Sequence, residues 1–150
     1  MEKFDLVVLG GGVIGSASLR ACMQQEPNLD ACLIELEDDL AIHQSGRNSG
    51  VVHVGYNQKP GTMKAKYVVE GSRRLRAYCK EKSIPLVEGG ILIVAQSEED
   101  LGTLRELHAR GTENGASVEL LEKRRMLEVE PAAVGIGALF APEGASFDAR

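Results

Sequence analysis

Short apolar runs and amphipathic segments alternate along the chain, and their order predicts a mixed α/β fold. Residues 4–9 form an apolar run rich in β-branched side chains, which predicts a buried strand. A glycine-rich turn at residues 10–15 follows at once, then a largely apolar helix at residues 16–25 and a second buried strand at residues 31–35. This order is typical of a βαβ unit, in which the two strands are parallel and the crossover is right-handed.

A long segment without helical or strand periodicity, residues 37–58, follows this unit. A loop of this length inside a compact domain is usually functional. Residues 60–62, Pro-Gly-Thr, then open a long helix that ends at about Ser83. Its helical spacing predicts one inward face that carries Tyr67 and Cys79.

The second half predicts shorter elements in alternation. In order, they are strands at residues 84–87 and 91–95, a helix from Ser97 to Asn114, a strand at 118–121, a helix at 123–129 and a last strand at 139–141. Ser97 and Asp100 have the spacing of a capping box. The change of pattern near Ser83 predicts a domain boundary, with residues 1–83 before it and residues 84–150 after it. We expect both parts to be incomplete, because no closing element precedes Arg150.

Composition and charge narrow the function classes. The chain has 150 residues, 43% hydrophobic and 26% charged, which is enough apolar material for a core. Its net charge of -5 argues against a broad nucleic-acid-binding face. The apolar runs are too short to span a bilayer, and the N-terminus does not resemble a secretory signal. Three widely spaced cysteines fit a reducing compartment.

The glycine turn has the spacing of a dinucleotide-binding motif. Gly10 permits a tight turn, Gly12 lets backbone N–H groups approach a pyrophosphate, and Gly15 lets the helix pack close to the strand. The helix N-terminus directs N–H groups and its positive dipole end toward the phosphates. Glu35, at the end of the second strand, suits ribose hydroxyls and repels a 2′-phosphate. The motif predicts FAD or NAD, which it does not separate, and disfavours NADP.

The long loop carries a more specific signal. Residues 43–55 have the sequence HQSGRNSGVVHVG, and residues 59–65 have the sequence KPGTMKA. Both resemble FAD-dependent oxidoreductases of the D-amino-acid-oxidase superfamily, and within it the L-2-hydroxyglutarate dehydrogenase/oxidase family. Residues 88–95 and the pair Glu130-Pro131 also resemble that family. The sequence departs from it at Tyr56-Asn57, where an aliphatic residue followed by tyrosine is common.

The resemblance implies a Rossmann-like FAD-binding unit in residues 1–83 and the start of an α+β substrate domain in residues 84–150. It implies that the glycine turn and Glu35 hold the ADP half of FAD, and that the long loop lies along the pyrophosphate and the isoalloxazine. The implied cofactor-binding residues are Gly10, Gly12, Val13, Ile14, Gly15, Glu35, Ser45, Gly46, Arg47, Asn48, Ser49, Gly50 and His53. The alternative for the loop is an ordinary Gly/Ser/Asn turn.

The implied reaction is oxidation of L-2-hydroxyglutarate, or a similar 2-hydroxy acid, to the 2-oxo acid by hydride transfer to flavin N5. A quinone or oxygen would then accept the electrons. Two alternatives stay open: a glycerol-3-phosphate or amino-acid oxidoreductase of the same superfamily, and a non-catalytic nucleotide-binding module. No catalytic residue is assigned, and the histidine and cysteine spacing predicts no metal site. We expect a cytoplasmic protein, with peripheral membrane association allowed, and we expect residues 1–150 alone to be inactive.

Overall fold

The structure is a computed structural model that describes residues 3–149, and it divides into two compact units. Residues 3–49 belong to the first unit together with Ala149, and Gly50–Asp148 form the second. The division falls within the long loop, whereas the sequence pattern placed a boundary near Ser83. The helix that precedes Ser83 therefore belongs to the same unit as the elements that follow it.

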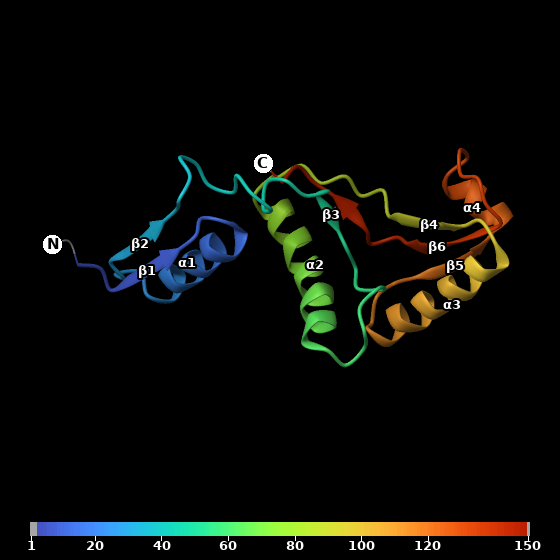
Figure 1. The fold of residues 1–150 in the computed structure, drawn as a ribbon, viewed down its shortest axis with the longest axis horizontal. Coiled ribbons are helices and arrows are strands. Elements are labelled where there is room, and N and C mark those ends of the chain that lie inside the picture. Colours follow the sequence, from blue (N-terminus) through green and yellow to red (C-terminus); the bar gives the residue numbers. More distant parts are fainter. Residues whose placement is uncertain (1–2, 150) are drawn as a thin grey trace. The chain divides into compact units, whose positions relative to one another are not determined.

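The first unit is a βαβ unit, as the sequence predicts (Figure 1). Strands β1 (Leu6–Leu9) and β2 (Ala31–Ile34) pair in parallel, with Leu6 opposite Ala31 and Leu9 opposite Ile34. Helix α1 (Val13–Gln25) connects them and begins three residues earlier than expected. The earlier start follows from Gly12, whose extended backbone (φ -74°, ψ 178°) already serves as the N-cap.

The two faces of the β1–β2 sheet differ in exposure. Val8 of β1 lies beside Gly15 of α1, so this side chain is partly covered by the helix. Its neighbours Val7 and Leu9 alternate to the opposite face, where they are 45% and 78% exposed. The glycine turn thus joins a strand and a helix that pack against each other through one face of the sheet.

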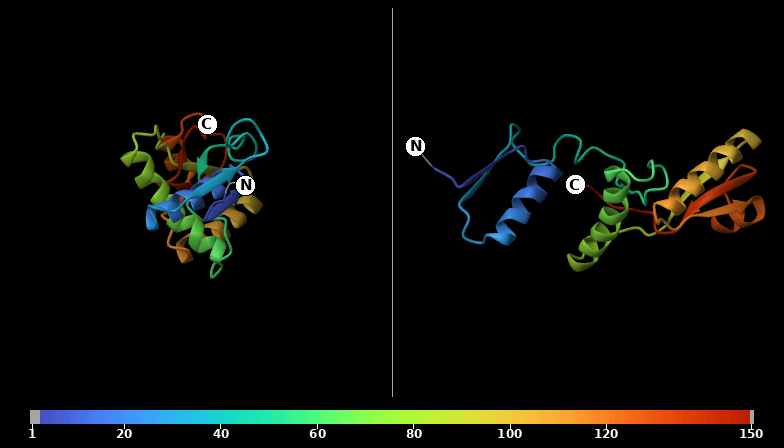
Figure 2. Two further views of the ribbon diagram at one scale, coloured as in Figure 1. Left: turned by 90° about the vertical axis from the view of Figure 1, so that its left-hand side faces the viewer. Right: turned by 90° about the horizontal axis from the view of Figure 1, so that it is seen from below.

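The second unit is an α+β arrangement (Figures 1 and 2). In chain order its elements are β3 (Val51–Val52), α2 (Met63–Glu81), β4 (Ile91–Ala95), α3 (Glu98–Glu113), β5 (Glu119–Glu122), α4 (Lys123–Val129), β6 (Gly137–Ala141) and β7 (Ala145–Ser146). Strands β4, β6 and β5 form an antiparallel sheet in that order, and β3 pairs with β7. The unit is thus built around one three-stranded sheet and one short ladder.

Strand β6 lies in the middle of the three-stranded sheet and contributes to two hydrophobic clusters. Leu139 packs in a cluster with Leu104 of α3, whereas its neighbour Ala138 packs with Met126 of α4. Because successive side chains of a strand point to opposite faces, the two helices cover opposite faces of this sheet. The α3 cluster also contains Val54 and Tyr56, so the loop that follows β3 is part of the core.

Several predicted elements are confirmed and others are wrong. Helix α2 starts after Thr62, whose hydroxyl accepts a hydrogen bond from the Ala65 N–H, and α3 has the predicted capping box at Ser97 and Asp100. Residues 84–87 are not a strand, since only Val87 makes an isolated bridge, to Ser146.

The structure also adds two strands that the pattern did not predict, β3 and β7. The predicted inward face of α2 is partly wrong. Cys79 is buried as expected, but Tyr67 is 61% exposed. The buried positions of α2 are Cys79, which the prediction includes, and Ala65 and Ser72, which it does not.

Candidate functional site

The glycine turn between β1 and α1 requires glycine at two of its positions. Gly10 has a φ of +99°, a conformation that side-chain-bearing residues rarely adopt, and its N–H donates to the Ile34 carbonyl at 2.8 Å. At Gly15, an added Cβ would run into the carbonyl oxygen of Gly10. The turn therefore brings the first turn of α1 directly against the end of β1, as the spacing predicts.

The carboxylate of Glu35 is fixed by three backbone N–H groups. One oxygen, Oε2, accepts from Gly11 at 2.5 Å, and the other, Oε1, accepts from Leu36 at 2.7 Å and Glu37 at 3.2 Å. These bonds, that from Gly11 first, lower the pKa of Glu35 below its ordinary value of 4.5, and His43 adds a smaller effect in the same direction. An ionised carboxylate consequently lies beside the glycine turn.

Ser45 caps the N-terminus of α1 from the long loop. Gly12 has no side chain to serve as a cap, and the Ser45 hydroxyl oxygen accepts a hydrogen bond from the Val13 N–H at 2.9 Å. A Cβ built on Gly12 would lie 3.1 Å from the same oxygen. The structure thus brings Gly12, Val13 and Ser45 together, although Ser45 follows Val13 by 32 positions.

The rest of the loop within the first unit is organised by Asn48. Its side-chain nitrogen donates to the Gln44 carbonyl at 3.1 Å and to the Ser45 carbonyl at 2.8 Å, so both amide hydrogens hold the loop. Arg47 is exposed and, with Gly46, borders a surface hollow. His43 lies 2.8 Å from a Glu37 carboxylate oxygen, which braces the segment that follows Glu35.

The remaining predicted residues, Gly50 and His53, belong to the second unit. Gly50 has a φ of +64°, and a Cβ there would run into the Phe147 carbonyl oxygen, while the Phe147 N–H donates to the Gly50 carbonyl at 3.0 Å. His53 is exposed, and its ring centroid lies 6.2 Å from that of Tyr56 at an angle of 56°. Tyr56 itself is buried, which raises its pKa above the ordinary value of 10.0.

One residue that supports this segment was missed as part of the site. Asn114, at the end of α3, donates from its side-chain nitrogen to the carbonyl oxygens of Gly55 and Gln58, both at 2.9 Å. In the sequence, Asn114-Gly115 carries only the signal of a helix end. The contact joins positions far apart in the chain, so no local pattern could have revealed it.

The residues of the first unit fit the ADP half of a dinucleotide. The N-terminus of α1 carries exposed Val13 and Ile14, at 65% and 79%, so its first turn is accessible to an anionic group. The ionised carboxylate of Glu35 can accept hydrogen bonds from ribose hydroxyls. Among residues 3–149, by contrast, no group of three or more histidine, cysteine, aspartate or glutamate side chains has the arrangement of a metal site.

A family model and the sequences of known relatives both match almost the whole chain. The family model described as "FAD dependent oxidoreductase" matches residues 5–150. The chain is 41% identical over 143 residues to a mitochondrial L-2-hydroxyglutarate dehydrogenase of Caenorhabditis briggsae, covering 95% of the chain and 33% of the relative. It is 39% identical over 150 residues to the Homo sapiens protein of that name, covering 99% of the chain and 32% of the relative. The chain thus spans about one third of these relatives' length.

Solved structures agree on the fold. The FAD-bound, dithionite-reduced L-α-glycerophosphate oxidase from Mycoplasma pneumoniae superimposes with a TM-score of 0.89 at 31% identity, over 99% of the chain and 40% of that protein. Glycine oxidase from Geobacillus kaustophilus superimposes with a TM-score of 0.86 at 22% identity, over 99% and 42%. At that lower identity the likeness concerns the fold alone.

Proposed function

Because the chain belongs to the FAD dependent oxidoreductase family, we propose that the protein containing it oxidises L-2-hydroxyglutarate, or a similar 2-hydroxy acid, to the corresponding 2-oxo acid. The observation that carries this proposal is the identity of about 40% to relatives named L-2-hydroxyglutarate dehydrogenase over almost the whole chain. The sequence of the long loop, which resembles the same family, supports it independently of the glycine turn.

We assign the ADP half of FAD to the first unit. Gly10 permits the tight turn, Gly15 lets α1 pack against the end of β1, and Gly12 leaves room for the pyrophosphate. Val13 and Ile14 begin the helix whose N-terminus is proposed to face it. Glu35 accepts hydrogen bonds from the ribose. Its carboxylate is already ionised and fixed by Gly11, so little reorganisation is needed when a ribose hydroxyl becomes a donor.

We assign the pyrophosphate and the isoalloxazine to the long loop. Ser45 already contacts the start of α1, which is where the pyrophosphate is expected. Asn48 uses both amide hydrogens within the loop, so its proposed part is to hold the backbone of Gly46, Arg47 and Ser49 in place. We also assign Gly50 and His53, whose ring is exposed, to the isoalloxazine.

When bound, FAD supplies the acceptor for the hydride that leaves C2 of the hydroxy acid. The residues described here would bind and orient the cofactor: the glycine turn and Glu35 would hold the nucleotide, and the long loop would lie along the pyrophosphate and the ring system. Arg47 is exposed and carries a guanidinium that suits a phosphate or carboxylate oxygen. No side chain among residues 3–149 is assigned as the base that removes the hydroxyl proton.

A second substrate class has one observation in its favour. The 31% identity and TM-score of 0.89 to L-α-glycerophosphate oxidase make glycerol-3-phosphate the principal alternative. The glycine oxidase and the L-proline dehydrogenase among the structural neighbours share less sequence with the chain, at 22% and 18% identity. We rank L-2-hydroxyglutarate first because the relatives of that name are more similar in sequence.

We propose that a quinone or oxygen accepts the electrons from the reduced flavin. We also propose a cytoplasmic location with peripheral membrane contact. Within residues 3–149, no helix has the length and apolar character needed to cross a bilayer. The curated relatives are named mitochondrial, so fractionation of cells that express the protein is required to decide its compartment.

The proposed reaction is tested by turnover in the product of the complete reading frame that contains this sequence, hereafter the complete gene product. L-2-hydroxyglutarate, its D-enantiomer, glycerol-3-phosphate and glycine are compared with a dye as electron acceptor, and 2-oxoglutarate is identified by mass. We expect turnover with L-2-hydroxyglutarate and a kcat/KM lower by at least about 100-fold for the others. Preferential turnover of glycerol-3-phosphate would replace the proposal with its alternative.

A further inference from the structure

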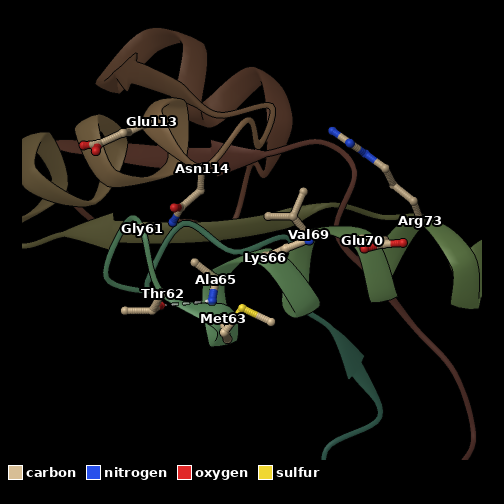
Figure 3. A pocket seen from close by; sticks show the side chains of 10 residues that line it. All are labelled: Gly61, Thr62, Met63, Ala65, Lys66, Val69, Glu70, Arg73, Glu113 and Asn114. Carbon is tan, nitrogen blue, oxygen red and sulfur yellow. Dashed lines mark hydrogen bonds between the residues drawn. The ribbon is translucent and has the colours of Figure 1, made fainter.

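The end of α3 holds the turn that follows β3 through a single side chain. The Asn114 side-chain nitrogen donates to both the Gly55 and the Gln58 carbonyl oxygens at 2.9 Å. Figure 3 shows this side chain directed toward the loop that leads into α2. A primary amide presents two N–H donors on one nitrogen, so one side chain can bind two carbonyls at once.

The backbone of the helix end leaves the Asn114 side chain available for this contact. Gly115 has a φ of +74°, its N–H donates to Thr112 at 3.0 Å, and the Ala116 N–H donates to Gly111 at 2.9 Å. These two bonds form a Schellman motif, in which the last carbonyls of a helix are satisfied by its own backbone. Asn114 therefore does not serve as a side-chain cap for its own helix.

The turn at residues 55–58 is fixed on its other sides as well. Tyr56 is 6% exposed, and a Cβ on Gly111 of α3 would lie 3.1 Å from the Tyr56 Cβ, so the two segments are closely packed at this glycine. Gly55 has a φ of +100° and packs against Val69 of α2. The Gln58 N–H closes the turn by donating to the Gly55 carbonyl at 3.2 Å.

We propose that Asn114 is a positioning residue that sets where the His53 ring is presented to the flavin. His53 lies two residues before Gly55, and its ring packs 6.2 Å from that of Tyr56, in the middle of the turn that Asn114 holds. The inference rests on the proposed function, in which His53 lies beside the isoalloxazine. Removal of the two N–H donors leaves two carbonyls without this partner and lets the turn, and His53 with it, shift.

The test compares Asn114→Asp with Glu113→Gln in the complete gene product loaded with FAD. Asn114→Asp keeps the size of the side chain but removes both donors. Glu113→Gln is the matched control, because Glu113 is the exposed neighbouring residue on the same helix end. The readouts are the visible circular dichroism of the bound flavin, the rate of anaerobic flavin reduction, KM and Tm.

For Asn114→Asp we expect an altered visible flavin spectrum and flavin reduction slower by about 10- to 100-fold, the effect of a small displacement near a reacting centre. We expect KM to change by less than about threefold, because His53 is not proposed to bind the carboxylates. Glu113→Gln should match the unmodified protein in all four readouts. A lowered Tm with an unchanged flavin spectrum and rate would overturn the inference, since Asn114 would then be structural only.

Three further outcomes have different meanings. If Asn114→Asp fails to fold, Asn114→Ala, which removes both donors without adding a charge, replaces it, and an unchanged flavin spectrum and rate in that variant overturn the inference. If the unmodified protein binds no FAD, the proposed function fails and the inference with it. If FAD is bound but L-2-hydroxyglutarate does not reduce it, only the substrate is wrong, and the flavin spectra of the variants still decide the role of Asn114.

Discussion

The carboxylate of Glu35 accepts a hydrogen bond from the backbone N–H of Gly11, with 2.5 Å between Oε2 and the nitrogen. The contact joins the end of β2 to the glycine turn that follows β1, across 24 positions of sequence. The residue proposed to bind the ribose therefore also fixes the turn proposed to bind the pyrophosphate. Loss of this carboxylate should affect both parts of the nucleotide site.

Glu35→Gln should weaken FAD binding by about 10- to 100-fold, the effect of losing charge-assisted hydrogen bonds to ribose and to Gly11. The measurement is a fluorescence titration of the apoprotein with FAD. Asp38→Asn is the matched control, because it removes one negative charge from the same exposed segment. Equal losses in the two variants would mean that net charge, not the Gly11 contact, is responsible.

The stability contribution of Glu35 should disappear in acid. Hydrogen bonds, that from Gly11 first, lower its pKa in the folded state, so the ionised form stabilises the fold. This contribution is complete above the ordinary pKa of 4.5 and is lost as the pH falls through the lowered value. Urea unfolding across pH should show a difference between unmodified protein and Glu35→Gln at pH values above 4.5 that closes below the lowered pKa. A difference that widens in acid would contradict this account.

Asp100 is a second carboxylate whose lowered pKa should make the stability of the fold depend on pH. Its pKa is also lowered, mainly by the Ser97 hydroxyl in the capping box of α3, which lies in the second unit. Asp100→Asn should therefore be less stable than the unmodified protein at neutral pH, and this difference should close in acid, as for Glu35→Gln. Its FAD affinity should stay within about twofold of the unmodified protein. Weaker FAD binding in this variant, measured by the same titration, would show that acid-sensitive stability and nucleotide binding are not separable.

Ser45→Ala should destabilise the protein by about 1 kcal/mol, the usual cost of losing a side-chain cap at a helix N-terminus. The lost contact is the hydrogen bond that the Ser45 oxygen accepts from the Val13 N–H. Ser49→Ala, an exposed position in the same loop, is the control and should be close to neutral. Urea unfolding and hydrogen exchange at Val13 measure the effect, and unchanged exchange at Val13 would argue against the cap.

Gly15→Ala should destabilise the fold by about 1–3 kcal/mol, the cost of forcing an extra methyl group into a packed position. The added Cβ would meet the Gly10 carbonyl oxygen, so α1 must move away from the glycine turn. Gly102→Ala in α3 is the matched control, because its Cβ would meet nothing within 4 Å. That variant should be neutral or more stable by up to about 1 kcal/mol, the difference in helix propensity. Equal Tm changes in the two variants would contradict the close packing at Gly15.

The sequence predicted those parts of the fold in which local chemistry and the final structure agree. The βαβ unit, the start of α2 at Thr62, the capping box of α3 and the helix Lys123–Val129 all depend on neighbouring residues. Strands β3 and β7 were missed because each has two residues and is defined only by its partner. The same pairing joins Val51 and Val52 to Ala145 and Ser146, which all belong to the second unit.

In the candidate site too, the sequence predicted only features that depend on neighbouring residues. Gly10 and Gly15 could be recognised because backbone conformation and close approach leave a glycine signature. The capping of Val13 by Ser45 and the binding of Gly55 and Gln58 by Asn114 could not, because an ordinary polar side chain gains these roles only when distant segments meet. Their contribution is tertiary, and a single sequence carries no local trace of it.

The visible spectrum of the complete gene product under anaerobic conditions tests the proposed function most directly. We expect flavin absorption bands in the purified or FAD-reconstituted protein, and loss of these bands when L-2-hydroxyglutarate is added. Bands that persist with L-2-hydroxyglutarate but are lost with glycerol-3-phosphate would contradict the proposed substrate. Absence of flavin even after reconstitution would contradict the proposed oxidoreductase function and favour a non-catalytic nucleotide-binding module.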